Sequence, residues 1–445
     1  MRSGNTAARL RLQDVAATMQ PAADGRGMVF SLDGRVYRAL GPGQADLYRN
    51  LLHAGFREEL FQAGLVRCWE SGLELEGYGL VLECRRIPVV SYPPEWPAAV
   101  LREAGRTVAA LGLALARHGL VLQDAHPWNV LFEGPRGVFV DLGSLAPGGQ
   151  VPDGWMREFR ARLVLPLSLH RLGLHGPAGA LLARQGPAST WESAPACRWF
   201  PPRYARLALL RGRPAEYFAR LLAYLGQPPA DPGGAGDAAP SGGERAAAAF
   251  LDRLPRGIVV DLWAGDGARA ARLARRGHNV VALERDGRWL DRLFGVARAE
   301  GLPLLPLRVD PFWPAGSTGL TLGYADAPSR LRGDLALAMD ALHRLAGAQG
   351  LTFDLFARVL HQFARAAAVV EFVPPEDPAA APWPLRSLPW YTLEGLVRAV
   401  EPYFPRASLL HGEPGGRCVL LFRREAGTRY ETTDVPASAV GSWSL

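Results

Sequence analysis

The chain contains no lysine: all 50 of its Lys or Arg residues are arginines, and they are spread along the predicted helices without forming one block. The formal net charge of +7 is therefore not gathered into a basic patch, and nucleic-acid binding is not predicted. No apolar run is long enough to span a membrane. The best candidate, residues 111–122, is interrupted by Arg117 and His118.

Cysteine is also scarce, with four residues at positions 68, 84, 197 and 418. They lie far apart, and no CxxC or cysteine–histidine spacing accompanies them, so a zinc site or another metal site is not predicted. The first residues carry no apolar signal-peptide core. We expect a cytoplasmic protein with reduced thiols and no membrane partner.

The length of 445 residues predicts two or three domains. The clearest boundary is a stretch of Pro, Gly and Ala over residues 227–243, which is typical of a linker. We predict an α+β domain over residues 1–226, an α/β domain over residues 244–425 and a polar tail over residues 426–445.

The second domain is organised around a strand, a glycine turn, a helix and a second strand. Residues 258–260 are a β-branched run that can lie buried in a parallel sheet. A helix is expected over residues 268–276, where Gly277 can end it in a left-handed conformation. The second strand covers residues 280–283 and closes on Glu284.

This turn has the composition of a nucleoside site. Gly265 and Gly267 allow a ligand to approach the backbone, and an acid closing the second strand can bind the two hydroxyls of a ribose. The turn opens on Asp261 and resembles motif I of class I S-adenosylmethionine (SAM) dependent methyltransferases, with Trp263 in place of the first glycine. The alternative is an ordinary βαβ unit with a tight turn and no ligand.

Two further strand ends carry candidate site residues. A third strand is expected over residues 304–309. After it, Asp310 and Phe312 lie where the resemblance places an acid for the adenine amino group and an apolar side chain for its ring. Their alternative is a turn acid and a loop aromatic. A fourth strand is expected over residues 334–339. After it, His343 is the candidate general base, with Asp340 as a second proton acceptor. The alternative for His343 is a helix-start histidine without chemistry.

The first domain contains a segment that resembles the catalytic segment of kinases. Asp124, Asn129 and Asp141 fall at the spacings of the catalytic Asp, the metal-binding Asn and the second metal-binding Asp, with a hairpin between the last two. The lysine that contacts nucleotide phosphates cannot exist in this chain, and Arg38 is its nearest stand-in. The three residues could serve phosphotransfer, hold the loop through internal hydrogen bonds, or bind substrate or metal.

Taken together, residues 28–425 resemble a bacterial family of two-part class I SAM-dependent methyltransferases related to nodulation host-specificity proteins. The residues that carry the resemblance are Arg86-Ile87-Pro88, Ser91-Tyr92-Pro93, Glu95-Trp96, Gln123 to Val130, Val140-Asp141, Val260-Asp261-Leu262, Asp334 to Ala338 with His343, and Glu371-Phe372-Val373-Pro374 with Asp377.

The resemblance implies a Rossmann-like methyltransferase domain after a kinase-like α+β domain. It also implies that Asp261, Gly265, Gly267 and Glu284 bind SAM. We expect methyl transfer to an oxygen or nitrogen of a small molecule, a sugar or a peptidic metabolite. The alternatives are a phosphotransferase in the first domain and a non-catalytic scaffold. The acceptor and the oligomeric state do not follow from the sequence.

Overall fold

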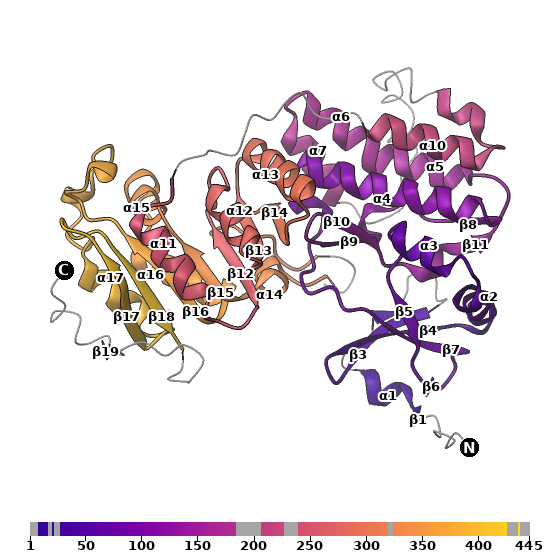
Figure 1. The fold of residues 1–445 in the computed structure, drawn as a ribbon, viewed down its shortest axis with the longest axis horizontal. Helices are drawn as coiled ribbons and strands as arrows, with labels where there is room; N and C mark the ends of the chain where they lie inside the picture. Colours follow the sequence, from indigo (N-terminus) through magenta and orange to yellow (C-terminus); the bar gives the residue numbers. More distant parts are fainter. Residues whose placement is uncertain are drawn as a thin grey trace. The chain divides into compact units, whose positions relative to one another are not determined.

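The structure is a computed structural model that describes residues 8–16, 20–21, 27–183, 206–226, 239–318, 324–424 and 435–436 (Figure 1). The chain forms two compact units. Unit 1 comprises Met1–Pro94 and Leu101–Pro229, and unit 2 comprises Glu95–Val100 and Ala230–Leu445. Residues 227–238 of the predicted linker, Cys197 and all of the predicted tail except 435–436 lie outside the described residues. Both units combine helices and strands, as the sequence predicts.

Unit 1 is built on a five-stranded sheet, which continues into a mainly helical part. In order across the sheet, its strands are β2 (Gln20–Pro21), β3 (Gly27–Leu32), β4 (Arg35–Leu40), β7 (Leu80–Cys84) and β5 (Cys68–Glu70). Three two-stranded pairs accompany it: β1 (Ala8–Leu10) with β6 (Leu73–Leu75), β8 (Leu120–Leu122) with β11 (Leu145–Pro147), and β9 (Val130–Glu133) with β10 (Arg136–Phe139). The helices are α1 (Leu12–Val15), α2 (Pro42–His53), α3 (Arg57–Gln62), α4 (Ala98–Ala116), α5 (Asp153–Phe159), a π-helical turn over Arg160–Val164, α6 (Leu165–Arg171), α7 (His175–Ala183) and α10 (Pro214–Leu225).

Local turn chemistry explains the first hairpin of unit 1. An Asp-Gly pair between two apolar runs, here over residues 28–40, predicts a hairpin. Asp33 and Gly34 both have positive φ angles, 49° and 76°, and this two-residue turn joins β3 to β4 as expected. Farther along, the strand β5 was not predicted. Residues 73–76 and 79–83 have the pattern of two strands on either side of a glycine turn. They do not pair with each other, because β6 pairs with β1, and β7 pairs with β4 and β5. The partners β1 and β4 are distant in the sequence, and local alternation carries no information about them.

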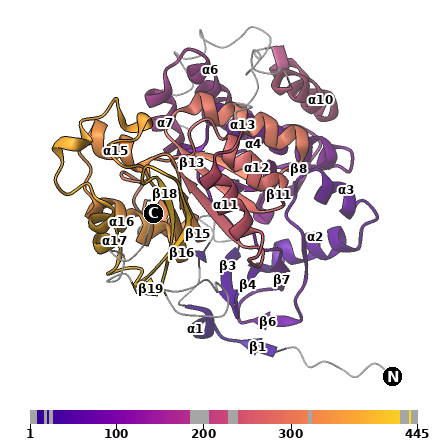
Figure 2. The ribbon, with the colours of Figure 1, turned by 60° about the vertical axis from the view of Figure 1, so that its left-hand side comes forward.

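Unit 2 contains an eight-stranded sheet whose order is Rossmann-like. Across the sheet the strands are β14 (Leu304–Arg308), β13 (Asn279–Glu284), β12 (Ile258–Leu262), β15 (Gly333–Ala338), β16 (Ala364–Phe372), β18 (Cys418–Arg423), β17 (Arg406–Gly412) and β19 (Val435–Pro436). The first five are parallel, and β18 runs antiparallel to β16 and β17. The apolar residues 408–410 and 418–422 predict a closing hairpin, and β17 and β18 confirm it. The α/β class of this unit is confirmed as well (Figure 2).

Helices cover both faces of this sheet. They are α11 (Gly242–Leu251), α12 (Ala268–Arg275), α13 (Gly287–Glu300), α14 (Ala327–Leu331), α15 (Leu342–Gln349), α16 (Phe353–Phe363) and α17 (Leu393–Val400). Helices α11, α12 and α13 bury Phe250, Leu273 and Leu293 with one face of the strands, in a core that includes Val259 and Leu337. Because both faces are covered, the central strands are continuous apolar runs, as expected for a parallel sheet.

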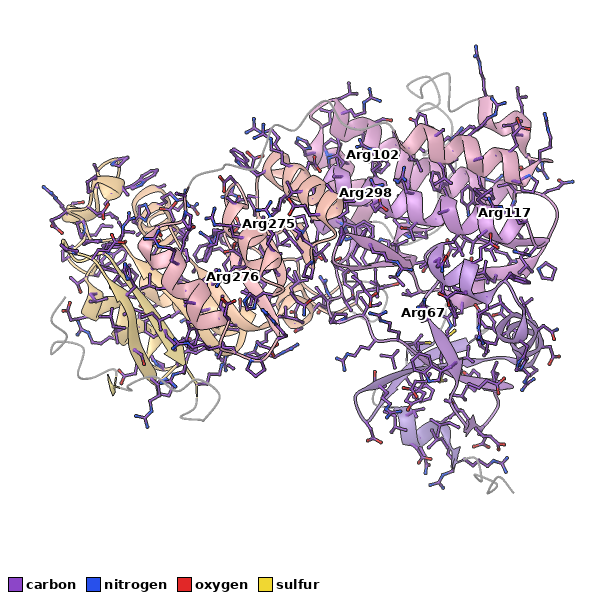
Figure 3. All side chains as sticks on the ribbon, in the orientation of Figure 1. Arg67, Arg102, Arg117, Arg275, Arg276 and Arg298 are labelled. Carbon is purple, nitrogen blue, oxygen red and sulfur yellow. The ribbon has the colours of Figure 1, made fainter. Side chains whose placement is uncertain are left out.

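The arginines are distributed over both units, as the sequence analysis expects. Figure 3 labels six of them, and these include arginines that pair with acids of their own unit. These pairs are Arg67–Glu58, Arg117–Glu59, Arg275–Glu300 and Arg276–Asp252. Within the described part of the chain, no helix combines the length and the apolar character that a membrane crossing requires.

Candidate functional site

The glycine turn after β12 brings three left-handed backbone positions close together. Gly265 and Gly267 have φ angles of 61° and 80°, and Trp263 has a φ angle of 54°. Glycine adopts this region without penalty, whereas a side chain there costs about 1–3 kcal/mol. Trp263 therefore takes the conformation that a glycine would take at the first position of the motif, and the turn keeps its shape at a cost in strain.

The Trp263 indole is buried on the apolar side of the turn. Only 7% of the residue is exposed. Its ring centroid lies 5.1 Å from that of Phe312 and 5.7 Å from that of Phe356. Packing against two aromatic rings compensates for the backbone strain. Phe312, predicted to face an adenine ring, thus has one neighbour in Trp263.

Glu284, at the end of β13, faces the turn. Its Oε2 accepts the backbone N–H of Gly265 at 2.9 Å, and its Oε1 accepts the N–H groups of Arg285 and Asp286 at 2.6 and 3.2 Å. A carboxylate has about four lone-pair sites, so this one retains capacity for further donors such as ribose hydroxyls. A Cβ built on Gly265 would meet nothing within 4 Å, so open space lies beside the turn.

Asp261 lies beneath the turn and does not reach this space. The residue is 0% exposed, and Arg269 of α12 binds it through Nη2 at 2.8 Å and Nε at 3.1 Å. Burial raises the pKa of the Asp261 carboxyl, although the Arg269 charge opposes that effect. A direct contact between Asp261 and a ligand, which the motif predicts, would require this ion pair to open. In this structure Asp261 positions Arg269.

A cavity of about 470 Å³ opens at the carboxyl ends of β12, β15 and β16. It is lined by Ala239, Ser241, Glu244, Trp263, Ala264, Gly265, Asp266, Ala268, Arg269, Arg272, Trp289, Asp340, Arg344, Glu371 and Arg417. Strand order reverses between β12 and β15, and open α/β sheets bind ligands in the crevice at such a switch point. The volume is in the range of small-molecule sites.

Asp340 enters the cavity from the end of β15 in a strained conformation. Its φ angle is 52°, and its backbone N–H donates to Oε2 of Glu371 at 2.8 Å. Glu371 lies near the end of β16, is only 4% exposed, and has Arg417 at 4.0 Å from its Oε1. Burial raises the pKa of the Glu371 carboxyl. Trp263 and Asp340, two non-glycine residues with positive φ angles, therefore line the same cavity, and backbone strain of this kind clusters at functional sites.

His343, the predicted general base, does not line the cavity. It is 2% exposed, and its Nε2 lies 3.8 Å from Oδ1 of Asp340. Its Nδ1 is buried without a hydrogen-bond partner, and burial lowers the pKa of its imidazole. The wall of the cavity carries the Asp340 carboxylate instead, so of the two predicted proton acceptors, Asp340 is the one that meets the cavity.

Several other predicted residues also lie outside the lining. Glu284, Asp310 and Phe312 are not part of it. Gly267 serves packing, because a Cβ there would lie 2.6 Å from Cδ2 of Leu293 on α13. Asp310 accepts the N–H of Phe312 at 3.0 Å, which is the turn-acid alternative, and its other oxygen lies 3.4 Å from Arg285.

Apart from Asp340, the charged residues on the cavity wall were not predicted to take part in the site. Glu371 lies one residue before the end of β16, close to the place that Glu284 has at the end of β13, so its position carried a signal that strand-end acids share. Glu244 has no comparable signal: it belongs to the capping box of α11 and binds Arg272 at 2.7 Å. The pairing of Arg269 with Asp261 also depends on the folded turn.

In unit 1, the kinase-like motif is joined by internal hydrogen bonds. Asn129 donates its amide to Oδ2 of Asp124 at 2.9 Å, and Oδ1 of Asp124 accepts the N–H of His126 at 2.7 Å. Asp141 accepts a hydrogen bond from Arg38 and another from the N–H of Gly143 at 3.1 Å. This is the loop-holding arrangement considered from the sequence. Among the described residues, no group of three or more His, Cys, Asp or Glu side chains could hold a metal.

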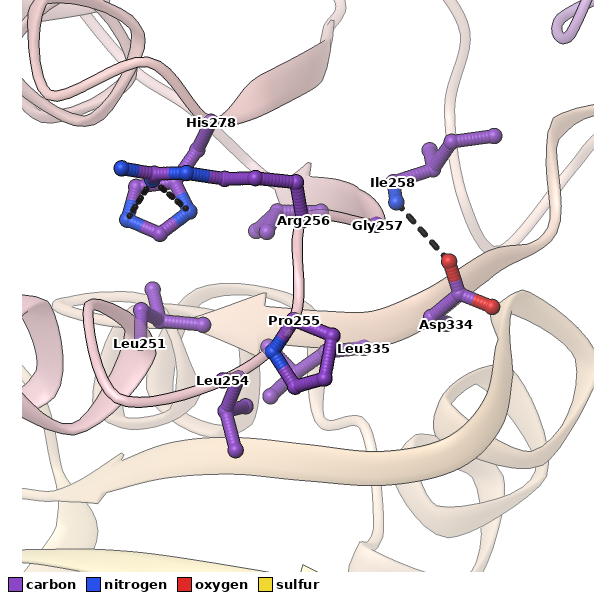
Figure 4. Close-up of a pocket in the computed structure, with 10 residues that line it drawn as sticks. Leu251, Leu254, Pro255, Arg256, Gly257, Ile258, His278, Asp334 and Leu335 are labelled. Atoms are coloured by element: carbon purple, nitrogen blue, oxygen red, sulfur yellow. Dashed lines mark hydrogen bonds between the residues drawn. The ribbon is translucent and has the colours of Figure 1, made fainter. Parts of the chain in front are cut away.

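A smaller cavity, of about 70 Å³, lies at the opposite edge of the unit 2 sheet, where β12, β13 and β15 begin (Figure 4). Asp334 accepts the N–H of Ile258 at 2.9 Å, and the Arg256 guanidinium contacts the ring of His278 at 3.1 and 3.2 Å. Ligands of parallel sheets bind at the carboxyl ends, so these contacts secure strand starts.

Comparison with known proteins supports the predicted relation to nodulation proteins. Over 113 residues the chain is 33% identical to the nodulation protein NoeA of Rhizobium meliloti (strain 1021), a stretch that covers 25% of this chain and 21% of NoeA. No protein-family model matches the chain.

Solved structures similar to the chain include the bifunctional kinase-methyltransferase WbdD, with 16% identity, a TM-score of 0.33, and coverage of 47% of this chain and 45% of WbdD. Another is magnesium protoporphyrin IX methyltransferase of Synechocystis PCC 6803, crystallised with SAM, with 14% identity, a TM-score of 0.29, and coverage of 41% and 78%. The chain thus spans about a fifth of NoeA and less than half of WbdD. TM-scores this low do not establish a shared fold. The fold of unit 2 is assigned from its own strand order.

Proposed function

We propose that unit 2 binds SAM and transfers its methyl group to an oxygen or nitrogen of a small molecule, a sugar or a peptidic metabolite. The observation that carries the proposal is the Gly265–Glu284 contact at a sheet edge with an adjoining cavity. A carboxylate with spare lone pairs faces a turn that is open to the approach of a ligand. Those are the groups that a ribose and its attached chain require.

Each part of the site has a role under this proposal. Glu284 would hold the ribose hydroxyls, and the backbone of Gly265 would lie against the chain beyond the ribose. When bound, SAM supplies a methyl group on a positively charged sulfonium, and a metal is not needed to activate it. The charged wall, with Asp340 and Glu371 beside Arg344 and Arg417, would orient a polar acceptor.

The acceptor proton would pass to Asp340. Its side chain is half exposed and lines the cavity, whereas His343 is enclosed. Orientation of the acceptor should contribute most of the rate acceleration, because a methyl transfer is an in-line displacement. Glu371 would fix the Asp340 backbone through its hydrogen bond, so that the Asp340 carboxylate stays on the wall.

The experiment is calorimetric titration of the full chain with SAM and with S-adenosylhomocysteine. We expect one site with a dissociation constant in the micromolar range, about −8 kcal/mol. A flat titration with both ligands up to millimolar concentrations would reject the proposal. It would favour the non-catalytic scaffold, in which Trp263 and its aromatic neighbours simply fill the turn.

A further inference from the structure

Arg38, the stand-in for the missing kinase lysine, is directed at the motif's second aspartate. It lies on β4, and only 7% of the residue is exposed. Its Nη2 donates to Oδ1 of Asp141, and its Nη1 donates to the carbonyl of Val140 at 3.2 Å. The guanidinium therefore binds the carboxylate and the backbone directly before it.

The other groups that would bind a metal are engaged with each other. Kinases hold their two Mg²⁺ ions through the Asn of the catalytic loop and the Asp that follows the hairpin. Here the amide nitrogen of Asn129 is turned toward Asp124, at 2.9 Å from Oδ2. The remaining oxygen of Asp124 accepts the N–H of His126. Two of the motif's acids thus meet protein donors where a cation would otherwise lie.

Helix α2 encloses this arrangement. Gln44 donates to the carbonyl of Gly143 at 2.8 Å, next to Asp141, and the side chain of Tyr48 is fully buried. The Arg38 Nε, the Gln44 Oε1 and the Tyr48 hydroxyl are buried there without hydrogen-bond partners. Arg38 is thus held by its charge on Asp141 and not by complete hydrogen bonding. A charge in such surroundings needs a partner of opposite sign, because water cannot replace it.

We propose that Arg38 is the resident cation of unit 1: its guanidinium takes the position beside Asp141 that a divalent metal takes in kinases. The motif then keeps its shape without Mg²⁺, and unit 1 does not bind a magnesium nucleotide. Arginine suits this role better than lysine, because its planar fork reaches the Asp141 carboxylate and the Val140 carbonyl together.

The test is a set of thermal unfolding curves of the full chain, with and without millimolar Mn²⁺ and with and without Mg²⁺ and ATP. We expect the wild-type Tm to change by less than about 1 °C in either condition. Arg38→Ala should lower the Tm by roughly 5 °C or more, since it leaves Asp141 unpaired. Mn²⁺ should recover at least about half of that loss, and should recover none of it in Arg38→Ala/Asp141→Ala.

Arg35→Ala is the matched control, because Arg35 lies on the same strand with an exposed side chain paired to Glu83. It should neither lose Tm nor respond to Mn²⁺. A wild-type rise with Mg²⁺ and ATP that Asp141→Ala abolishes would overturn the proposal, and this comparison does not depend on the folding of the Arg38 variants. An Arg38→Ala variant that folds, and whose Tm does not rise with Mn²⁺, would overturn the proposal as well.

Discussion

The Glu284 carboxylate accepts the backbone N–H of Gly265 at 2.9 Å. This bond joins the end of β13 to the turn after β12, so the acid that the sequence assigns to a ribose lies against the turn that the sequence assigns to the same ligand. If the pair binds an adenosyl group, removal of the acid should weaken that ligand, and the loss should be measurable without knowledge of the acceptor.

Glu284→Ala should lower the affinity for S-adenosylhomocysteine at least about tenfold, because hydrogen bonds to a charged group contribute about 1.5–3 kcal/mol each. Calorimetric titration of the full chain provides the measurement. Glu300→Ala is the control, since Glu300 is an exposed acid on α13 that pairs with Arg275. Equal affinity of wild type and Glu284→Ala would remove Glu284 from the site.

Trp263→Gly tests whether the Trp263 side chain lines the ligand site or blocks it. The change relieves the strain at a φ angle of 54° but removes the packing on Phe312 and Phe356. Loss of a buried aromatic side chain costs about 3–5 kcal/mol and the strain returns about 1–3 kcal/mol, so we expect a net loss of about 2 kcal/mol in denaturant unfolding. Affinity for S-adenosylhomocysteine should persist in both proteins.

Trp313→Gly is the comparison for that experiment, because Trp313 is 81% exposed in the neighbouring loop. Its effect on stability should stay within about 0.5 kcal/mol. If wild type binds no ligand and Trp263→Gly does, the indole blocks the site and the natural protein is a scaffold.

Asp340→Gly should make the protein more stable and less active. Glycine tolerates the φ angle of 52°, while the exposed pair with Arg344 at 3.3 Å contributes little. We expect the free energy of unfolding in urea to rise by about 1 kcal/mol. Asp286→Gly is the contrasting variant: Asp286 caps α13 at a φ angle of −78°, and its replacement by glycine should destabilise by a few tenths of a kcal/mol. A fall in stability for Asp340→Gly would mean that its position carries no stored strain.

Glu158 should make the stability of unit 1 depend on pH. Its pKa is raised from 4.5 to about 8, first by burial and then by its hydrogen bond to Asp124. A carboxyl with a raised pKa keeps its proton in the folded state and loses it in the unfolded state at the same pH. Its contribution to stability is therefore complete below about pH 4.5 and is lost as the pH rises to about 8.

Glu158→Gln should flatten that pH dependence, because glutamine carries no proton to lose. Urea unfolding at several pH values between about 5 and 8 measures the slope. Exposed Glu74, on β6 of the same unit, provides the control, and Glu74→Gln should keep the wild-type slope. An unchanged slope in Glu158→Gln would assign the pH dependence to other groups.

Periodic and turn signals predicted much of the fold. The β-branched run before Asp261, Gly277 at a φ angle of 84° and the closing hairpin all lie where local sequence placed them. Local signals failed for β5, whose three residues pair with β7, the strand that follows β6. A short strand of that kind is stabilised by partners that its own sequence does not specify.

The site was predictable at its backbone and less so at its walls. A glycine after a strand and an acid at a strand end indicate a ligand site by their position in the sequence. Gly265 and Glu284 could therefore be named from the sequence. The burial of His343 and the ion pair between Asp261 and Arg269 depend on how the helices pack against the sheet. The sequence of one segment cannot indicate such packing. Apart from Asp340, the charged residues of the cavity were therefore found only from the fold.

The most direct test of the central claim is a crystal structure of the full chain grown with saturating S-adenosylhomocysteine. We predict nucleoside density at the Gly265 turn, with the ribose hydroxyls within hydrogen-bond distance of Glu284 and the amino-acid end toward the cavity of Arg269 and Asp340. Density for Trp263 and Phe312 filling that space, with no nucleoside at the turn, would contradict the account.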